Sequence, residues 1–113
     1  MPRTRTASAE RLSDSAPVFA ALADRTRLRL VARLSEGGRV STVGLTAGTG
    51  ISRQAVAKHL DVLARAGIVR SERAGRERLW DLETARLARA ARSLERISRQ
   101  WDEALARLRA FVE

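Results

Sequence analysis

One segment of this 113-residue chain restricts the possible folds more than any other: SRQAVAKHLDVLARAGIV, residues 52–69. At about 100° per residue, its apolar side chains Val56, Leu60 and Leu63 fall within one narrow arc of a helix. Ser52 is a residue type that caps helix N-termini well. The pattern therefore predicts an amphipathic helix that begins at Ser52 and buries this arc in a core.

The segment before this helix predicts a second, shorter one. Ser41 is a suitable N-cap for a helix over residues 42–50, with Leu45 pointing inward. Two internal glycines each cost about 1 kcal/mol relative to alanine, so packing must hold this helix. Gly50 closes the segment just before the next helix starts. Two helices joined by so short a turn are typical of a helix-turn-helix.

The N-terminal part predicts a polar arm followed by ordered helices. Residues 1–14 are polar and basic with little periodicity, so we expect a disordered arm. Its arginines, Arg3, Arg5 and Arg11, either contact a phosphate backbone or form a solvated tail. Residues 15–113 then form a single domain, and its order begins near Pro17, which suits the first turn of a helix.

A longer helix is predicted after Asp24, in the sequence RTRLRLVARLSEGG. Asp24 is a good N-cap, and two consecutive glycines end the helix. Its arginines alternate with an apolar stripe that we expect to face the core, made of Leu28, Val31, Ala32 and Leu34.

Composition narrows the partner and excludes several kinds of site. Lys and Arg number 22 against 13 Asp and Glu, and the net charge of +9 favours a polyanionic partner. An arginine-rich soluble protein without such a partner is the alternative. The absence of cysteine excludes disulfides, thiolate metal sites and cysteine nucleophiles. No apolar run approaches the roughly 18 residues of a membrane span, so we expect a cytoplasmic protein without a membrane partner. We also expect no cofactor.

The exposed face of the helix that begins at Ser52 and stops at Gly67 has side chains suited to nucleic acid. Gln can pair with adenine and Lys with guanine, while free N–H groups at a helix N-terminus can hold a phosphate beside Ser52. A solvated charged face is the alternative. The side chains opposite the apolar arc are Gln54, Lys58, Asp61 and Arg65.

His59 is the only imidazole of the chain and lies beside the apolar arc of the same helix. A packing role or a phosphate contact is therefore expected. No second histidine and no cysteine lies near it, so we do not expect it to bind a metal.

The sequence IVRSERAGRERLWDL, which follows the glycine at the end of that helix, alternates charged with apolar or small residues. It predicts a two-stranded hairpin with Gly75 and Arg76 at the tip and with Leu79 and Trp80 anchoring its base to the core. A helix-turn-helix followed by a basic hairpin is a winged helix, mainly α with a small β-hairpin. The side chains placed to reach a groove or phosphate are Arg73, Arg76 and Arg78.

A long helix is predicted over residues 84–112. Leu87, Leu94, Trp101 and Leu108 recur every seven residues, and the helix would extend about 43 Å, more than so small a domain needs. It either packs on its own winged helix or pairs with a second copy, because an uncovered apolar patch is unfavourable. The residues expected at a dimer interface are Val18, Leu94, Ile97, Trp101, Leu105, Leu108 and Phe111.

These segments resemble a known family. FAALADRTRLRLVARLSEG and GISRQAVAKHLDVLARAGIVRSERAGRERLWDL are similar to the ArsR family of bacterial winged-helix transcriptional regulators, from about Val18 to the C-terminus. The resemblance implies a homodimer that binds operator DNA. The positions that it places at the DNA are Ser52, Arg53, Gln54, Lys58, His59 and Arg76.

The chain also departs from the metal-sensing members of that family. Those members carry a cysteine-containing box on the helix before the DNA-reading helix, or His and acidic pairs on the last helix. Here STVGLTAGTG contains no thiol, and the last helix contains no histidine. Thiolate and imidazole are the ligands that hold zinc-like and soft ions, so we expect no metal sensor. The chain resembles a cysteine-free subgroup with other or unknown inducers.

The resulting hypothesis is a sequence-specific DNA-binding regulator, a homodimeric repressor of an inverted-repeat operator. The alternative is a basic helical protein-interaction module or a non-specific nucleic-acid-binding protein. An enzyme is not expected, because the carboxylates of the helix and hairpin are scattered among arginines and form no catalytic constellation. A small-molecule inducer, the operator and the sign of regulation stay open.

Overall fold

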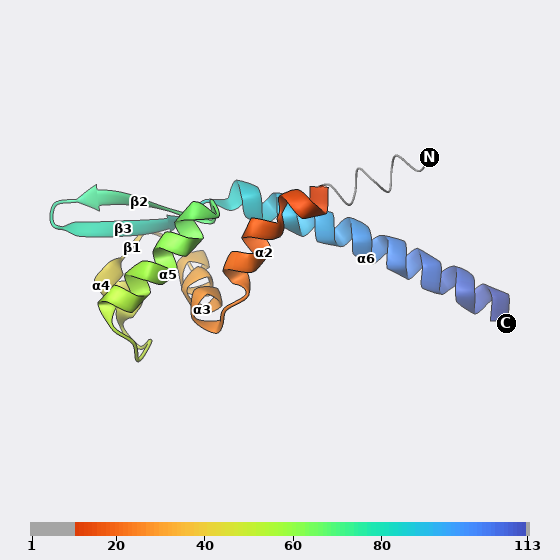
Figure 1. Cartoon of the computed structure of the whole chain (residues 1–113), viewed down its shortest axis with the longest axis horizontal. Helices are drawn as coiled ribbons and strands as arrows, with labels where there is room; N and C mark the ends of the chain where they lie inside the picture. Colours follow the sequence, from red (N-terminus) through yellow and green to blue (C-terminus); the bar gives the residue numbers. More distant parts are fainter. Residues whose placement is uncertain (1–10, 113) are drawn as a thin grey trace.

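The structure is a computed structural model that describes residues 11–112, and Figure 1 shows its elements. The helix-turn-helix, the hairpin and the long C-terminal helix are all present, which confirms the predicted winged helix. The elements are α2 (Ala16–Leu22), α3 (Arg25–Ser35), β1 (Val40–Ser41), α4 (Thr42–Thr46), α5 (Arg53–Arg65), β2 (Val69–Ala74), β3 (Glu77–Leu82) and α6 (Thr84–Val112).

The structure describes only the end of the expected N-terminal arm. Residues 1–10, with Arg3 and Arg5, lie outside the described residues. Residues 11–14 are helical, although we expected the arm to continue to residue 14. Ser15 extends this turn through two hydrogen bonds. Its N–H donates to the Leu12 carbonyl oxygen at 3.1 Å, and its hydroxyl donates to the Arg11 carbonyl oxygen at 3.4 Å.

The core lies between α2, α3, α5 and the sheet. The predicted arc of α5 is confirmed, since Val56, Leu60 and Leu63 are fully buried. Asp24 and Ser52 cap α3 and α5 as expected, each accepting a hydrogen bond from the backbone N–H three residues later. These local signals fix where the two helices begin, and the buried arc fixes which face of α5 is left exposed.

The predicted apolar stripe of α3 is partly wrong. Leu28 is half exposed at 50% and Ala32 is exposed, whereas Leu30 and Leu34 are buried. The buried stripe follows the i, i+3, i+4, i+7 spacing from Arg27, which is itself half buried. Arg27 occupies one position of the inward face. A prediction from apolar residues alone therefore placed the buried stripe at the wrong angle around the helix.

The first helix of the helix-turn-helix is shorter than expected. Ser41 caps α4 as predicted, accepting a hydrogen bond from the Gly44 N–H at 3.0 Å. The helix ends at Thr46 instead of continuing to residue 50. Gly48 and Gly50 have φ values of 79° and 74°, which are left-handed and incompatible with a continuing right-handed helix.

The hairpin forms part of a three-stranded antiparallel sheet in the order β1-β3-β2. Strand β1 was not expected from the sequence, and it pairs Val40 with Trp80. The predicted tip at Gly75 and Arg76 is confirmed between β2 and β3. Gly75 has a φ of 64°, whereas Arg76 does not have a positive φ, since among the described residues only glycines do. A positive φ at the first of the two turn residues alone is typical of a type II′ turn.

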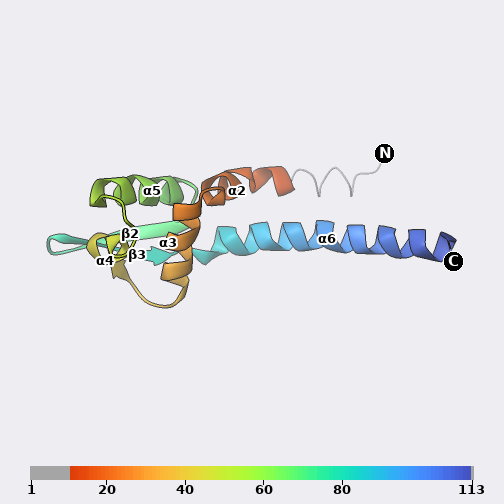
Figure 2. The same cartoon turned by 90° about the horizontal axis from the view of Figure 1, so that it is seen from below.

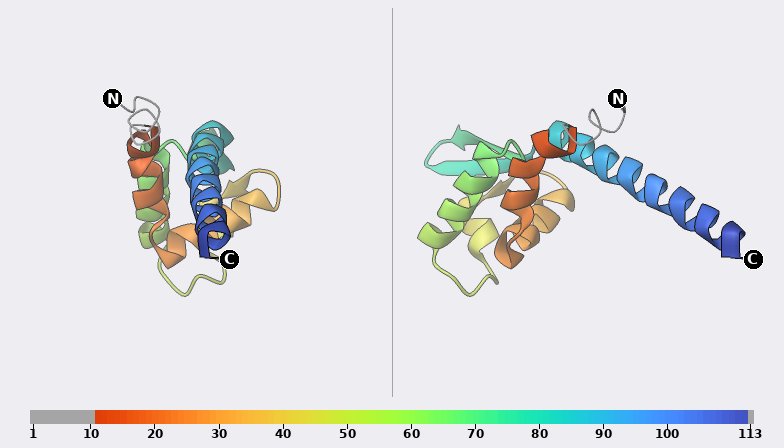
Figure 3. Two further views of the ribbon diagram at one scale, coloured as in Figure 1. Left: turned by 90° about the vertical axis from the view of Figure 1, so that its right-hand side faces the viewer. Right: turned by 45° about the vertical axis from the view of Figure 1, so that its right-hand side comes forward.

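Helix α6 has the predicted bounds and projects from the rest of the molecule (Figures 1, 2 and 3). The radius of gyration is 18.4 Å, whereas a compact chain of this length would have about 13 Å. The extents are 63 × 29 × 21 Å, and the hairpin tip and the C-terminal end of α6 lie at opposite ends of the longest axis. No helix in residues 11–112 has the length and apolarity to span a membrane.

Candidate nucleic-acid interface

The N-terminal half of α5 carries three exposed polar or charged side chains. Arg53, Gln54 and Lys58 are all exposed there, and Gln54 and Lys58 lie on the side away from the buried arc. Ser52 caps the helix, with its Oγ accepting a hydrogen bond from the Ala55 N–H at 3.1 Å. The remaining N–H groups of the first turn have no partner within the helix and point outward, a geometry that suits a phosphate.

The hairpin, called here the wing (residues 69–82), brings further positive charge to the same place. Arg53 and Gln54 of α5 line one groove of about 420 Å³ together with Arg76 and Arg78 of the wing. The start of α4 forms the third side of this groove, at residues 41–43. Three elements that are distant in the sequence therefore place amide and guanidinium groups around one opening.

The two faces of the wing differ in charge. Residues paired across an antiparallel hairpin share a face, and Arg73 pairs with Arg78 on the face that carries Trp80. The Arg78 guanidinium lies 5.8 Å from the centroid of the Trp80 ring, a cation–π contact. Like charges opposite each other destabilise a hairpin, and a polyanion at this face relieves that repulsion.

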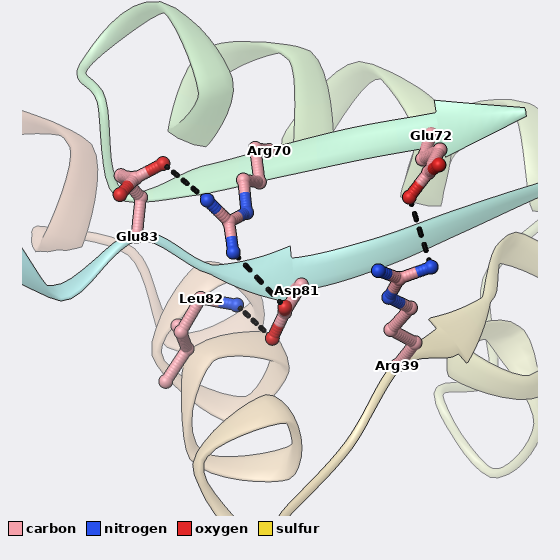
Figure 4. A network of polar contacts seen from close by, with 6 residues as sticks. All are labelled: Arg39, Arg70, Glu72, Asp81, Leu82 and Glu83. Atoms are coloured by element: carbon pink, nitrogen blue, oxygen red, sulfur yellow. Dashed lines mark hydrogen bonds and ion pairs between the residues drawn. The ribbon is translucent and has the colours of Figure 1, made fainter.

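The opposite face of the wing is neutralised by ion pairs, which Figure 4 shows. Arg39 pairs with Glu72 at 2.8 Å, while Arg70 lies 3.6 Å from Asp81 and 3.4 Å from Glu83. Such exposed pairs add little stability. They neutralise the positive charge on this face only. No ion pair within residues 11–112 involves the three arginines that we predicted at the DNA, Arg73, Arg76 and Arg78.

Trp80 fixes the wing to the helix-turn-helix as predicted, but Leu79 does not. Trp80 is 2% exposed, and its indole N–H donates to Thr42 Oγ1 at 2.9 Å. Leu79 is half buried on the other face of the sheet, because successive residues of a strand point to opposite sides.

His59 points toward a neighbouring helix, although the family resemblance places it at the DNA. Its Nδ1 lies 3.3 Å from an Arg27 guanidinium nitrogen and 3.9 Å from an Asp24 carboxylate oxygen. Arg27 Nε also donates to the Ala21 carbonyl oxygen at 2.6 Å, so this cluster joins α2, α3 and α5.

The pKa of the Asp24 carboxyl group is shifted by the groups around it. The hydrogen bond that it accepts from the Arg27 N–H lowers the pKa of its carboxyl group below the ordinary value of 3.8, with smaller contributions from the charges of Arg27 and His59. Within residues 11–112, no three His, Asp or Glu side chains come together as a metal site would require.

The residues expected at a dimer interface lie mostly on α6, where the single chain leaves them uncovered. Trp101 is 66% and Phe111 is 88% exposed, whereas Val18 of α2 is only 4% exposed and already packs within its own chain. Ile97 is half buried. The other expected residues that are exposed are Leu94, Leu105 and Leu108.

Comparison with known proteins agrees with this architecture. A family profile described as "Helix-turn-helix domain" matches residues 22–72. The chain is 41% identical over 68 residues to the uncharacterized HTH-type transcriptional regulator YuzN of Bacillus subtilis, covering 55% of this chain and 74% of that protein. It is 38% identical over 85 residues to the HTH-type transcriptional regulator Rv2034 of Mycobacterium tuberculosis, covering 75% of this chain and 76% of that protein.

A solved structure is similar over nearly its whole length. The ArsR-like transcriptional regulator from Rhodococcus sp. RHA1 superposes with a TM-score of 0.74 and 40% identity, covering 89% of this chain and 94% of that one. The fold and the exposed basic groove thus define a winged helix-turn-helix DNA-binding protein. The chain belongs to the ArsR family of transcriptional regulators, and it is a DNA-binding regulator.

Proposed function

We propose that this protein is a homodimeric repressor that occupies an inverted-repeat operator. The observation that carries the proposal is the uncovered apolar face of α6. Leu94, Trp101, Leu105 and Leu108 lie within an arc of about 60° on this helix and are all exposed in the single chain. A face of this kind is typical of a helix that packs against a second helix.

A second copy of α6 is the partner that fits this face best. The apolar residues recur with the seven-residue spacing of paired helices, and both copies would present the same face across a two-fold axis. Phe111 lies about 90° from the centre of the stripe, at the edge of such an interface. Val18 belongs at most to its periphery, because its own chain already buries it.

Dimerisation places two α5 helices in a two-fold arrangement. Each would enter the major groove of one half-site, with the half-site centres about 34–36 Å apart or a multiple of that distance. Gln54, Lys58 and Arg53 are the side chains we assign to base contacts. The first turn after Ser52 and the wing arginines are assigned to phosphates, so binding should weaken steeply with salt.

Repression follows from occupancy. A dimer that covers two adjacent turns of promoter DNA excludes other proteins from the same grooves, without a catalytic step. Action on DNA in a bacterial cell places the protein in the cytoplasm. We expect His59 to contribute less to DNA affinity than the other residues that we assign to DNA, since its Nδ1 is directed toward Arg27 and Asp24.

The experiment is a mobility shift of the full-length protein on the DNA upstream of its own gene, at moderate salt, against random DNA of equal length. We expect preferential binding that is lost when one half of the inverted repeat is scrambled. Equal affinity for both DNAs would contradict the repressor and favour non-specific nucleic-acid binding. An absence of DNA binding at low salt would favour a protein-interaction module.

A further inference from the structure

A second cavity lies between α2 and the N-terminal half of α6, away from the basic groove. It has a volume of about 340 Å³, within the range of small-molecule sites. Ala66, the C-cap residue of α5, forms part of its wall, about 20 Å along that helix from Ser52. The N-terminal end of α2 lies near the first turns of α6 here (Figure 1). We call this cavity the α2–α6 cleft.

The charged groups around the α2–α6 cleft are almost all of one sign. Five guanidinium groups and a single carboxylate line it, and four of the guanidinium groups come from α6. No ion pair within residues 11–112 involves the four arginines that α6 contributes. The charged residues that line the cleft are Arg11, Asp14, Arg86, Arg89, Arg92 and Arg96.

The arginines of α6 are concentrated on one side of the helix. At about 100° per residue, all four fall within an arc of about 120°, on the side that faces α2. Like charges three or four residues apart destabilise a helix, so this arrangement is unfavourable without an anion. The buried Ser93 adds a hydroxyl group to the same lining, whereas the Ser15 hydroxyl already donates to the Arg11 carbonyl oxygen. Guanidinium and hydroxyl groups are the donors that bind phosphate and carboxylate.

We propose that the α2–α6 cleft binds a small molecule with at least two negative charges, carried by phosphate or carboxylate groups. The binding site stands on the cleft itself, and a consequence for DNA rests on the proposed function. Arg86 makes the connection, because its guanidinium donates to the Ala66 carbonyl oxygen at 3.4 Å, at the C-terminal end of α5.

Arg86 is held closely against this end of α5. A Cβ added to Gly67 would lie 2.6 Å from Arg86 Cδ, so the side chain passes directly over the glycine backbone. An anion in the cleft draws the Arg86 guanidinium away from the Ala66 carbonyl and lowers the positive charge of the protein. Both effects weaken DNA binding, so the small anion acts as an inducer.

The test is isothermal titration calorimetry of the full-length protein with inorganic phosphate and, separately, with citrate, at constant ionic strength set by chloride. We expect saturable binding of at least one of them, and the stronger of the two identifies the group that the site prefers. The Arg89→Gln/Arg92→Gln variant should bind at least about tenfold more weakly. The Arg89→Lys/Arg92→Lys variant keeps the charge and should recover part of the affinity.

The matched control is Arg107→Gln/Arg109→Gln, which removes the same charge from the same helix beyond the cleft. Arg107 lies 18 residues, five full turns, after Arg89 and therefore on the same side of α6. Circular dichroism should show both double variants folded. If wild-type protein binds neither anion, or if the control loses as much affinity as the cleft variant, the proposed site is wrong.

The consequence for DNA has a separate measurement. At constant ionic strength, the better anion should lower operator affinity about 5-fold or more in wild-type protein and have no effect on Arg89→Gln/Arg92→Gln. Without any anion, DNA binding by this variant that is weaker than by the charge-matched Arg107→Gln/Arg109→Gln would instead assign the arginines to phosphates of DNA and overturn the proposal. Calorimetry needs no DNA, so failure of the repressor proposal remains distinguishable from failure of the anion site.

Discussion

The Trp80 indole N–H donates a hydrogen bond to Thr42 Oγ1 at 2.9 Å, between residues 38 positions apart in the sequence. Thr42 is the first residue of α4, and the preceding residue, Ser41, pairs with Leu79 of β3. The wing and the first helix of the helix-turn-helix are therefore joined by both a side chain and a strand pairing. This connection holds the wing arginines beside the N-terminal end of α5.

Replacing Thr42 by valine should destabilise the protein by about 1–3 kcal/mol. Valine keeps the shape of threonine but removes the acceptor, which leaves the buried indole N–H without a partner. Urea unfolding followed by circular dichroism measures the change. Thr84→Val is the control, because Thr84 is exposed at the start of α6. A similar loss in both variants, or none in Thr42→Val, would show that this hydrogen bond contributes little.

Gln54 and Arg76 line the same groove but should affect DNA binding differently. Gln54→Ala removes a base contact and should reduce the preference for the operator over random DNA, by about 1–3 kcal/mol. Arg76→Ala removes a phosphate contact and should weaken binding to all sequences about equally, lowering the salt slope by about 1. Fluorescence anisotropy at several salt concentrations separates the two effects.

Arg39→Ala is the control for both DNA variants. It removes one positive charge that already pairs with Glu72 on the other side of the sheet, so operator affinity should change little. If Arg39→Ala weakened binding as much as Arg76→Ala, net charge alone would explain the effect. The assignment of the wing to DNA would then be unsupported.

The parts of the fold that the sequence predicted are those with local causes. Asp24, Ser41 and Ser52 each cap a helix through a hydrogen bond to a backbone N–H three residues later. The buried arc of α5 follows from helical spacing alone. The opposed pair of Arg73 and Arg78 was also deducible, because a two-residue turn at Gly75 fixes the register of the hairpin.

The features that the sequence did not predict depend on contacts between distant segments. Strand β1 has only two residues and exists because β3 offers it a partner. The inward position of Arg27 depends on the Ala21 carbonyl and on His59 of another helix. The α2–α6 cleft requires two helices from opposite ends of the chain, so no local pattern could have brought its arginines together with Ala66.

The lowered pKa of Asp24 predicts a stability that depends on pH. A carboxyl group whose pKa falls on folding stabilises the folded state above its ordinary pKa, and this contribution is lost as the pH falls through the lowered value. Asp24→Asn keeps a good helix cap but cannot titrate. The variant should melt below wild type at about pH 7, and the difference should shrink toward about pH 3.

Thermal unfolding followed by circular dichroism across this pH range measures the effect of Asp24. Asp61→Asn is the control, since Asp61 is exposed within α5 and caps no helix. A difference between wild type and Asp24→Asn that stays constant with pH would mean that the carboxylate charge contributes nothing at this cap.

Trp101 provides the most direct test of the α6 interface. Trp101→Arg places a charge in the centre of the exposed apolar stripe, where a partner helix would have to bury it without a counter-charge. Light scattering should show a dimer for wild-type protein and a monomer for the variant. Gln100→Arg is the matched control, because it adds the same charge to the neighbouring residue, about 100° around the helix. The control should remain dimeric, and a dimeric Trp101→Arg would place the interface elsewhere.

A monomeric Trp101→Arg should also lose its preference for an intact inverted repeat, since one winged helix can contact only one half-site.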